Sequence, residues 1–167
     1  DVEPRANGNG NIYRNDTVYV FNSGGLVRQA RAPHPLLLLG FDVYFIPVER
    51  SIAGLREIGF DLSRMHEATW QGRPAYVVGA AAGDVRSRQF WIDRDRLVFV
   101  RMMEPSRRDT TKTSEIRFNR YYQVGEAWLS PEVEFLIDGA RDFLEEYTEI
   151  KTGMPVADSV FDPSRWR

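Results

Sequence analysis

The sequence predicts a mainly β member of the α+β class: a meander of roughly eight to ten antiparallel strands with two helices inserted near its start. Two observations lead to this prediction. Apolar and polar residues alternate through most of the chain after residue 62, and turn motifs separate the alternating segments. Residues 35–58 have a helical periodicity instead. At 167 residues the chain has the length of one domain, so we expect 1–167 to form a single sheet-based unit that curls over one apolar face.

The N-terminal region predicts a β-hairpin after an irregular start. Residues 1–11 are rich in Gly, Asn and charge, which is typical of a loose segment. Residues 17–21 (TVYVF) are β-branched or aromatic and predict a strand, and the NSGG sequence at 22–25 predicts a turn. We expect the returning strand at residues 26–30.

Two helices are expected between residues 33 and 59. Residues 35–46 are apolar almost all round and follow a proline at a helix-start position, which indicates a buried helix. Residues 47–58 predict an amphipathic helix, because the apolar residues Val48, Ile52, Leu55 and Ile58 recur at helical spacing. Gly59 is expected to cap this second helix.

The remaining chain predicts consecutive antiparallel strands joined by short turns. The expected strands are 64–70, 75–80, 86–92, 97–103, 114–122, 127–129, 132–137 and 143–150. Turns are expected at 71–74 (QGRP), 93–96 (DRDR) and 138–139 (DG). The residues after 150 are expected to form an extended tail.

Composition excludes several classes of function. The formal net charge is −2, which provides no basic field for nucleic acid. The chain contains no Cys and two His, so it lacks thiol nucleophiles and the usual zinc ligand sets. Nucleophile-elbow and phosphate-loop motifs are absent from the sequence. We therefore expect a protein that is not an enzyme and uses no metal or cofactor.

Paired carboxylates leave a hydrolase open as a third choice. The pairs are Asp93 and Asp95, Glu132 and Glu134, and Glu145 and Glu146. A glycosidase needs two such groups facing each other across a cleft. Turn hydrogen bonding for the aspartates, and the solvent face of a strand for Glu132 and Glu134, are the favoured interpretations.

Arginine is unusually frequent, because Lys112 and Lys151 are the only lysines among 22 basic residues. We interpret this as a coding bias that suggests a bacterial source. Arg117, Phe118, Arg120, Tyr121 and Tyr122 could stack nucleic-acid bases, but the slightly acidic chain favours a strand with outward arginines.

Aromatic residues make up 13% of the chain, and most lie on expected strands. Such a sheet face forms either a packed core or an apolar cavity, and the sequence does not distinguish the two. If a cavity forms between the sheet and the helical region, the expected ligand-binding residues are Tyr19, Phe21, Leu38, Phe41, Phe45, Phe90, Ile92, Val100, Met102 and Phe118.

The second half of the chain resembles the bacterial periplasmic lipoprotein-carrier superfamily, which includes LolA, LolB, RseB and outer-membrane lipoprotein-sorting-like proteins. Six stretches carry the resemblance: QFWID at 89–93, LVFVRM at 97–102, the strand at 116–122, VGEAWLSP at 124–131, YTEIK at 147–151 and DSVFDP at 158–163. The similarity covers roughly residues 60–163. It implies a strongly curved, incomplete antiparallel β-barrel with the helices as a lid, and it implies that an N-terminal part of the family fold is shortened or absent in this chain.

The resemblance also implies a function. Its members bind hydrophobic ligands without catalysis, so the expected partners are a lipid, an acyl chain or a lipoprotein in the periplasm or cell envelope. The alternative is an RseB-like sensor domain that binds another envelope protein. The longest apolar stretch, residues 35–46, is too short to cross a bilayer, so we expect no transmembrane segment in this chain.

Overall fold

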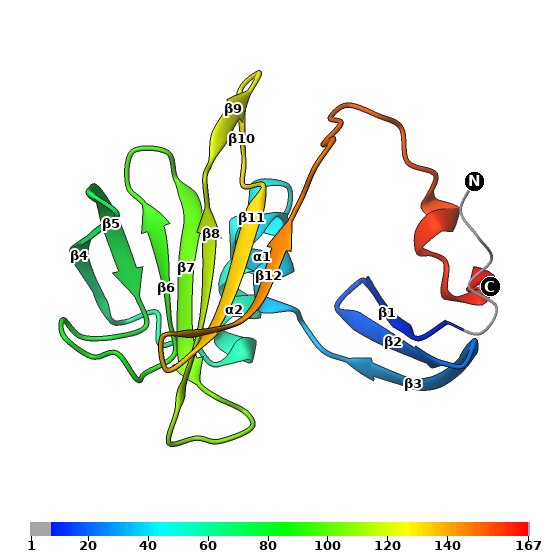
Figure 1. Cartoon of the computed structure of the whole chain (residues 1–167), viewed down its shortest axis with the longest axis horizontal. Coiled ribbons are helices and arrows are strands. Elements are labelled where there is room, and N and C mark those ends of the chain that lie inside the picture. The colour runs from blue at the N-terminus through cyan, green and yellow to red at the C-terminus, as the bar shows by residue number, and fades with distance from the viewer. Residues whose placement is uncertain (1–7, 167) are drawn as a thin grey trace. The chain divides into compact units, whose positions relative to one another are not determined.

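The computed structural model describes residues 8–166 and divides the chain into two compact units (Figure 1). One unit contains the chain up to Leu38 together with Lys151 onward, and the other contains Leu39–Ile150. The described strands form antiparallel sheets, none of which closes into a barrel. The mainly β, α+β class and the antiparallel pairing are therefore confirmed.

The first unit is built on a three-stranded sheet in the order β1-β2-β3. Its strands are β1 (Gly10–Arg14), β2 (Thr17–Asn22) and β3 (Gly25–Arg31). Two 3-10 helices from the C-terminal end, η2 (Asp158–Phe161) and η3 (Pro163–Arg165), belong to the same unit. The Trp166 ring stacks on Phe21 with ring centres 4.4 Å apart. A Cβ on Gly10 would lie 2.6 Å from that indole, so a larger residue there would displace the ring.

The second unit contains a seven-stranded sheet in the order β12-β11-β8-β7-β6-β5-β4 (Figure 1). Its strands are β4 (Met65–Trp70), β5 (Arg73–Val78), β6 (Gln89–Asp93), β7 (Val98–Pro105), β8 (Thr113–Asn119), β11 (Glu132–Ile137) and β12 (Ala140–Glu146). A small hairpin of β9 (Tyr122–Val124) and β10 (Ala127–Leu129) separates β8 from β11.

The register of this sheet gives its two faces different compositions. Phe90, Met102, Ile116 and Phe135 are directly paired across β6, β7, β8 and β11. Because side chains alternate along a strand, these residues share one face, which we call the helix face. The neighbouring row is Trp91, Arg101, Arg117 and Glu134, and it defines the arginine face.

Three short helical pieces precede the sheet: α1 (Pro35–Gly40), the 3-10 helix η1 (Asp42–Tyr44) and α2 (Val48–Ile58). Two contacts place them on the helix face. Phe60, just after α2, packs edge-on against Phe90 with ring centres 5.0 Å apart. Gly40 lies so close to the Phe118 ring that an added Cβ would be 3.2 Å from it. Within residues 8–166, no helix is long and apolar enough to cross a membrane.

Helix 47–58 and its glycine cap are confirmed. Gly59 has a φ of 98°, and its amide donates to the carbonyl oxygens of Leu55 and Arg56, as expected of a left-handed cap. The expected helix 35–46 is wrong as a continuous helix, because α1 ends at Gly40 and a 3-10 turn follows. It is also not buried all round, since Leu38 and Leu39 are buried whereas Phe45 is exposed.

Several strand boundaries also differ from expectation. Twelve strands are present in the described chain, and β12 begins at Ala140, directly after the tight turn, rather than at residue 143. The expected tail contains η2 and η3. Residues 1–7 of the expected loose start lie outside the described residues, and strand β1 already begins at Gly10.

Gly79 provides a test of the sheet geometry. Its φ is +107°, and a Cβ would lie 2.3 Å from the carbonyl oxygen of Arg88. Replacing Gly79 with Ala should lower the free energy of unfolding by about 3 kcal/mol, because backbone strain and a backbone clash add. Gly139→Ala is the matched control, since its φ is +77° with open space around it, and should cost about 1 kcal/mol. Urea unfolding curves measure both, and equal losses would contradict the close β5–β6 approach.

Candidate functional site

The turn between β6 and β7 is organised by the carboxylate of Asp93. Arg73 Nε donates to Asp93 Oδ2 at 2.5 Å, and its Nη2 donates to Oδ1 at 3.3 Å. The backbone amides of Asp95 and Arg96 also donate to Oδ1, at 3.1 and 3.0 Å. One buried carboxylate therefore fixes both the turn and the arginine that reaches it from β5. The expected local turn hydrogen bonds are confirmed for Asp93, whereas the Asp95 carboxylate pairs with Arg73 and Arg94 instead.

The environment of Asp93 keeps its carboxyl group ionised. Burial alone would raise its pKa, but the hydrogen bonds from Arg73 and from the Arg96 amide outweigh burial and hold the pKa below its usual value. A general acid in a hydrolase needs the opposite shift. Asp93 and Asp95 share Arg73, which donates to both carboxylates.

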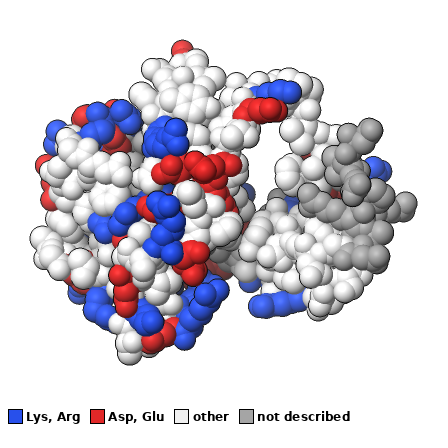
Figure 2. Space-filling view, viewed as in Figure 1, with Lys and Arg blue, Asp and Glu red and all other residues white. Residues whose placement is uncertain are grey.

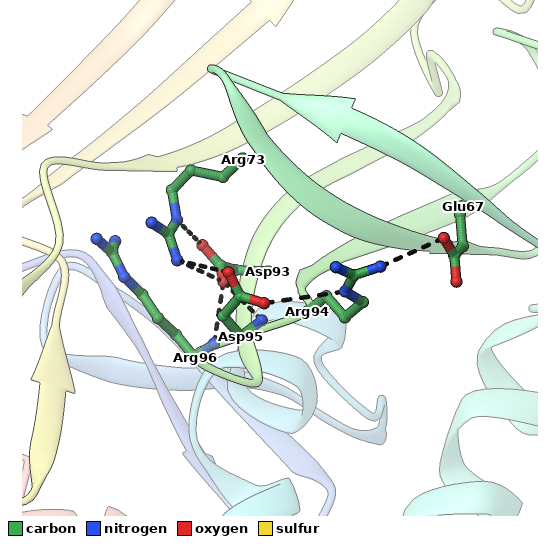
Figure 3. A network of polar contacts seen from close by, with 6 residues as sticks. All are labelled: Glu67, Arg73, Asp93, Arg94, Asp95 and Arg96. Carbon is green, nitrogen blue, oxygen red and sulfur yellow. Dashed lines mark hydrogen bonds and ion pairs between the residues drawn. The ribbon is translucent and has the colours of Figure 1, made fainter.

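A pocket of about 170 Å³ lies beside this turn. Its lining includes Trp70, Arg73, Asp93, Arg96, Arg120 and Tyr121. In Figure 3 the Arg73 and Arg96 guanidinium groups extend to the same side of the turn, whereas Arg94 extends to the other side toward Glu67. The pocket is smaller than the roughly 300–1,000 Å³ typical of sites that enclose a drug-sized ligand, so it suits a small chemical group.

The arginine face continues from the pocket as a ladder of charges. Arg101 Nε donates to Glu115 Oε1 at 2.7 Å, and Arg117 Nε donates to the same oxygen at 2.6 Å. Arg117 also reaches Glu134, which accepts from Arg141 Nε at 2.8 Å. Figure 2 shows basic and acidic side chains next to one another over this unit. Each charge is therefore matched by an opposite charge on the same strand or a neighbouring one.

Two indoles enclose the buried end of the ladder. The Arg101 guanidinium carbon lies 4.5 Å from the Trp70 ring centre and 4.8 Å from that of Trp91. Its side chain is only 15% exposed. Trp91 Nε1 in turn donates to Gln89 at 3.0 Å. Aromatic stacking and the Glu115 carboxylate together make the burial of this cation tolerable.

Glu115 is held ionised in the same way as Asp93. Burial would raise its pKa, but hydrogen bonds from Arg117 and Arg101 and their charges outweigh burial, so the pKa lies below its usual value of 4.5. The carboxylate side chain is 7% exposed. If Glu115 lost its charge, Arg101 and Arg117 would lose the carboxylate on β8 that they share.

The ten expected ligand-binding residues do not form one group. Phe90, Val100, Met102 and Phe118 are buried in the second unit, and Ile92 is half-buried there. Phe41 and Phe45 belong to the same unit and are exposed. Tyr19 and Phe21 belong to the first unit, where Phe21 is buried and stacks on Trp166. Leu38 is also buried and is the last residue of the first unit before the chain enters the second.

The other candidate residues form hydrogen bonds or ion pairs with side chains of the protein itself. Glu132 accepts from Asn119 and Arg120, and Glu145 accepts from Tyr147. Arg117, expected to face outward, is half-buried in the ladder. Across residues 8–166, no three His, Asp or Glu side chains come together as metal ligands.

Sequence patterns alone did not predict roles for Arg101, Arg73 and Arg96, whereas Arg117 and Arg120 were expected only as base-stacking or outward-facing residues. A usable signal exists, since Arg101 interrupts the apolar run at 98–103, where an unpaired charge would be costly. The alternating Glu115 and Arg117 on the next strand supply the matching charges. Comparison of the chain with protein-family models, with curated proteins and with solved structures gave no match in any of the three.

Glu115→Gln tests the charge ladder. At pH 7 the variant should lose roughly 2 kcal/mol of unfolding free energy, because two arginines lose their shared carboxylate. The folded pKa lies below the unfolded value of 4.5, so the ionised group stabilises the fold above that pH. As the pH falls below 4.5, the difference in unfolding free energy between the parent protein and the variant should become smaller. Urea titrations at several pH values measure this.

Glu67→Gln is the control for that series. Glu67 forms an exposed pair with Arg94 at 3.4 Å, so its loss should cost less than about 1 kcal/mol at every pH. The assigned role of Glu115 would be contradicted if the loss of unfolding free energy in Glu115→Gln stayed constant or increased at acidic pH.

Proposed function

We propose that the second unit is a non-catalytic binding module for a hydrophobic ligand, such as a lipid or the acyl chain of a lipoprotein, in the bacterial cell envelope. One observation carries this proposal: large apolar side chains stand exposed on the segment that covers the helix face. Phe45 is 86% exposed, Val48 63%, Phe41 52% and Tyr44 50%. We call these four residues the apolar lid surface. Exposed apolar side chains gathered in this way are typical of interaction sites.

The packing beneath the lid supports a ligand on its outer surface rather than under it. Phe90, Phe99 and Phe118 are buried, and Phe99 packs edge-on against Phe118 with ring centres 5.0 Å apart. These rings fill the helix face as a core would. A ligand that entered beneath the lid would have to displace Phe60 from Phe90.

Two polar contacts hold the lid segment to the sheet. Tyr44 donates its hydroxyl to the Leu97 carbonyl oxygen at 3.0 Å. At the other end, the Arg88 guanidinium donates to the carbonyl oxygen of Ile58, and a second nitrogen pairs with Glu104 at 2.8 Å. The segment between these anchors carries Phe45 and Val48 of the apolar lid surface, so movement there can adjust to a ligand without unfolding the sheet.

Strong curvature of the sheet is part of the proposal. Gln71 Nε2 donates to Asn119 Oδ1 at 3.0 Å, and the Arg117 guanidinium carbon lies 5.5 Å from the Trp70 ring centre. Strands β5, β6 and β7 separate these partners in the sheet. In a flat sheet β4 and β8 would be about 19 Å apart. These contacts favour a sheet that bends toward its arginine face.

The envelope location and the carrier-like role rest on the resemblance to the periplasmic lipoprotein-carrier superfamily. A sensor domain that binds another protein is the second candidate. Strand β12 favours it, because β12 pairs only with β11 and exposes Phe143 on an open sheet edge. A protein partner would add a strand there, whereas a lipid would not.

The apolar lid surface is tested with a fluorescent long-chain fatty acid as the probe. Phe45→Ser should weaken binding about tenfold, since burial of a phenylalanine contributes about 1.5–3 kcal/mol and each 1.4 kcal/mol is a factor of ten. Val85→Ser is the matched control, because Val85 is also exposed in the second unit but lies in the β5–β6 loop. Fluorescence titration gives both dissociation constants.

Equal binding by the two variants, or no binding of the probe to the parent protein, would overturn the proposed function. In that case a change in the amide signals of β12 on addition of an envelope extract would favour the sensor role.

A further inference from the structure

The pocket at the β6–β7 turn is rich in hydrogen-bond donors and poor in acceptors. Three arginines, Arg73, Arg96 and Arg120, line it together with a single carboxylate, that of Asp93. Asp93 is already saturated by Arg73 and two backbone amides. The lining therefore holds three cations and one anion, and Asp95, Glu132 and Glu146, outside the lining, pair with Arg73 and Arg120.

Arg96 is the most available of these cations. Its guanidinium carbon lies 4.4 Å from the ring centre of Trp128 on β10, and within residues 8–166 it makes no ion pair. Stacking on an indole fixes the plane of the guanidinium while leaving its N–H edge open. A planar, oriented fork of this kind is the donor that matches carboxylate and phosphate oxygens.

The other two arginines are held in place but keep unused donors. Arg73 uses Nε and Nη2 on the aspartates, and Arg120 uses Nη1 on Glu132 at 3.5 Å. Trp70, which also lines the pocket, has a buried indole N–H without an acceptor among the described residues.

We propose that this pocket binds the anionic oxygen group, phosphate or carboxylate, of an amphiphilic ligand. The inference rests on the proposed function, since the apolar part of that ligand would lie on the apolar lid surface. The two sites meet at one turn: Leu97, whose carbonyl oxygen anchors Tyr44, directly follows Arg96. A pocket of about 170 Å³ has room for a headgroup but not for a long acyl chain.

Val100, Phe118 and Pro74 supply apolar walls beside the arginines. An anion that brings its own hydrocarbon body therefore fits this lining better than a free, fully hydrated ion. Decyl phosphate and decanoate carry both parts, decanol carries the hydrocarbon alone, and inorganic phosphate carries the anion alone.

The test measures binding of these four probes by titration calorimetry to the parent protein and to Arg96→Gln. Decyl phosphate should bind the parent at least about tenfold more tightly than decanol, the effect of one strong charge-assisted hydrogen bond. Arg96→Gln should remove about tenfold of that preference and leave decanol binding unchanged. Raising the salt concentration should reduce the preference in the parent.

Arg94→Gln is the matched control, because Arg94 lies in the same turn but pairs with Glu67 and Asp95 on the side away from the pocket. It should keep the full preference for decyl phosphate. Arg96→Lys keeps the charge and loses the planar fork, so it should bind with intermediate strength. Thermal unfolding of each variant shows that the fold is retained.

The outcomes separate the two proposals. If decanol and decyl phosphate bind equally and Phe45→Ser weakens both, the anion pocket is wrong and the hydrophobic site stands. The hydrophobic site is wrong if decanol does not bind, binding of decyl phosphate and inorganic phosphate requires Arg96, and Phe45→Ser leaves the binding of all probes unchanged. Equal loss of the preference in Arg94→Gln and Arg96→Gln would also overturn the pocket, because the effect would then be that of general charge.

Discussion

The charge ladder on the arginine face constrains the register of the seven-stranded sheet. Arg101, Glu115, Arg117 and Glu134 lie on three adjacent strands and meet only in the observed pairing. A slip of one residue on any strand would move its charges to the helix face, among Phe90 and its neighbours. Buried, unpaired charges cost several kcal/mol each, so such a slip is strongly disfavoured. The ladder therefore specifies one alignment even where apolar burial alone would allow others.

The Asp93 turn connects this sheet to the two proposed binding surfaces. The Asp93 carboxylate accepts from Arg73 on β5 and from the backbone amide of Arg96, and the Leu97 carbonyl oxygen at the end of the turn accepts from Tyr44. Tyr121 adds a hydrogen bond from its hydroxyl to the Phe99 carbonyl oxygen, just beyond the turn.

Features set by neighbouring residues could be predicted from the sequence, and those set by long-range contacts could not. Helix 47–58, its cap at Gly59 and the tight turn at 138–139 follow from local periodicity and turn chemistry, and all are present. Gly40, where α1 ends, lies against Phe118 of β8, nearly 80 residues later by the printed numbering. Likewise, periodicity shows that a strand has two faces, but not which one meets Phe60 and which one meets Trp70.

Some of the arginines also have structural roles that the composition alone does not reveal. A preference for Arg over Lys reads as a coding bias when the residues are only counted. At Arg101, however, the guanidinium lies close to two indoles and also donates to Glu115, and at Arg73 two nitrogens of one guanidinium bind one carboxylate. A lysine ammonium is more strongly hydrated and cannot stack flat or donate from two nitrogens. At these positions, and at Arg96 over Trp128, the geometry requires arginine whatever produced the bias elsewhere in the chain.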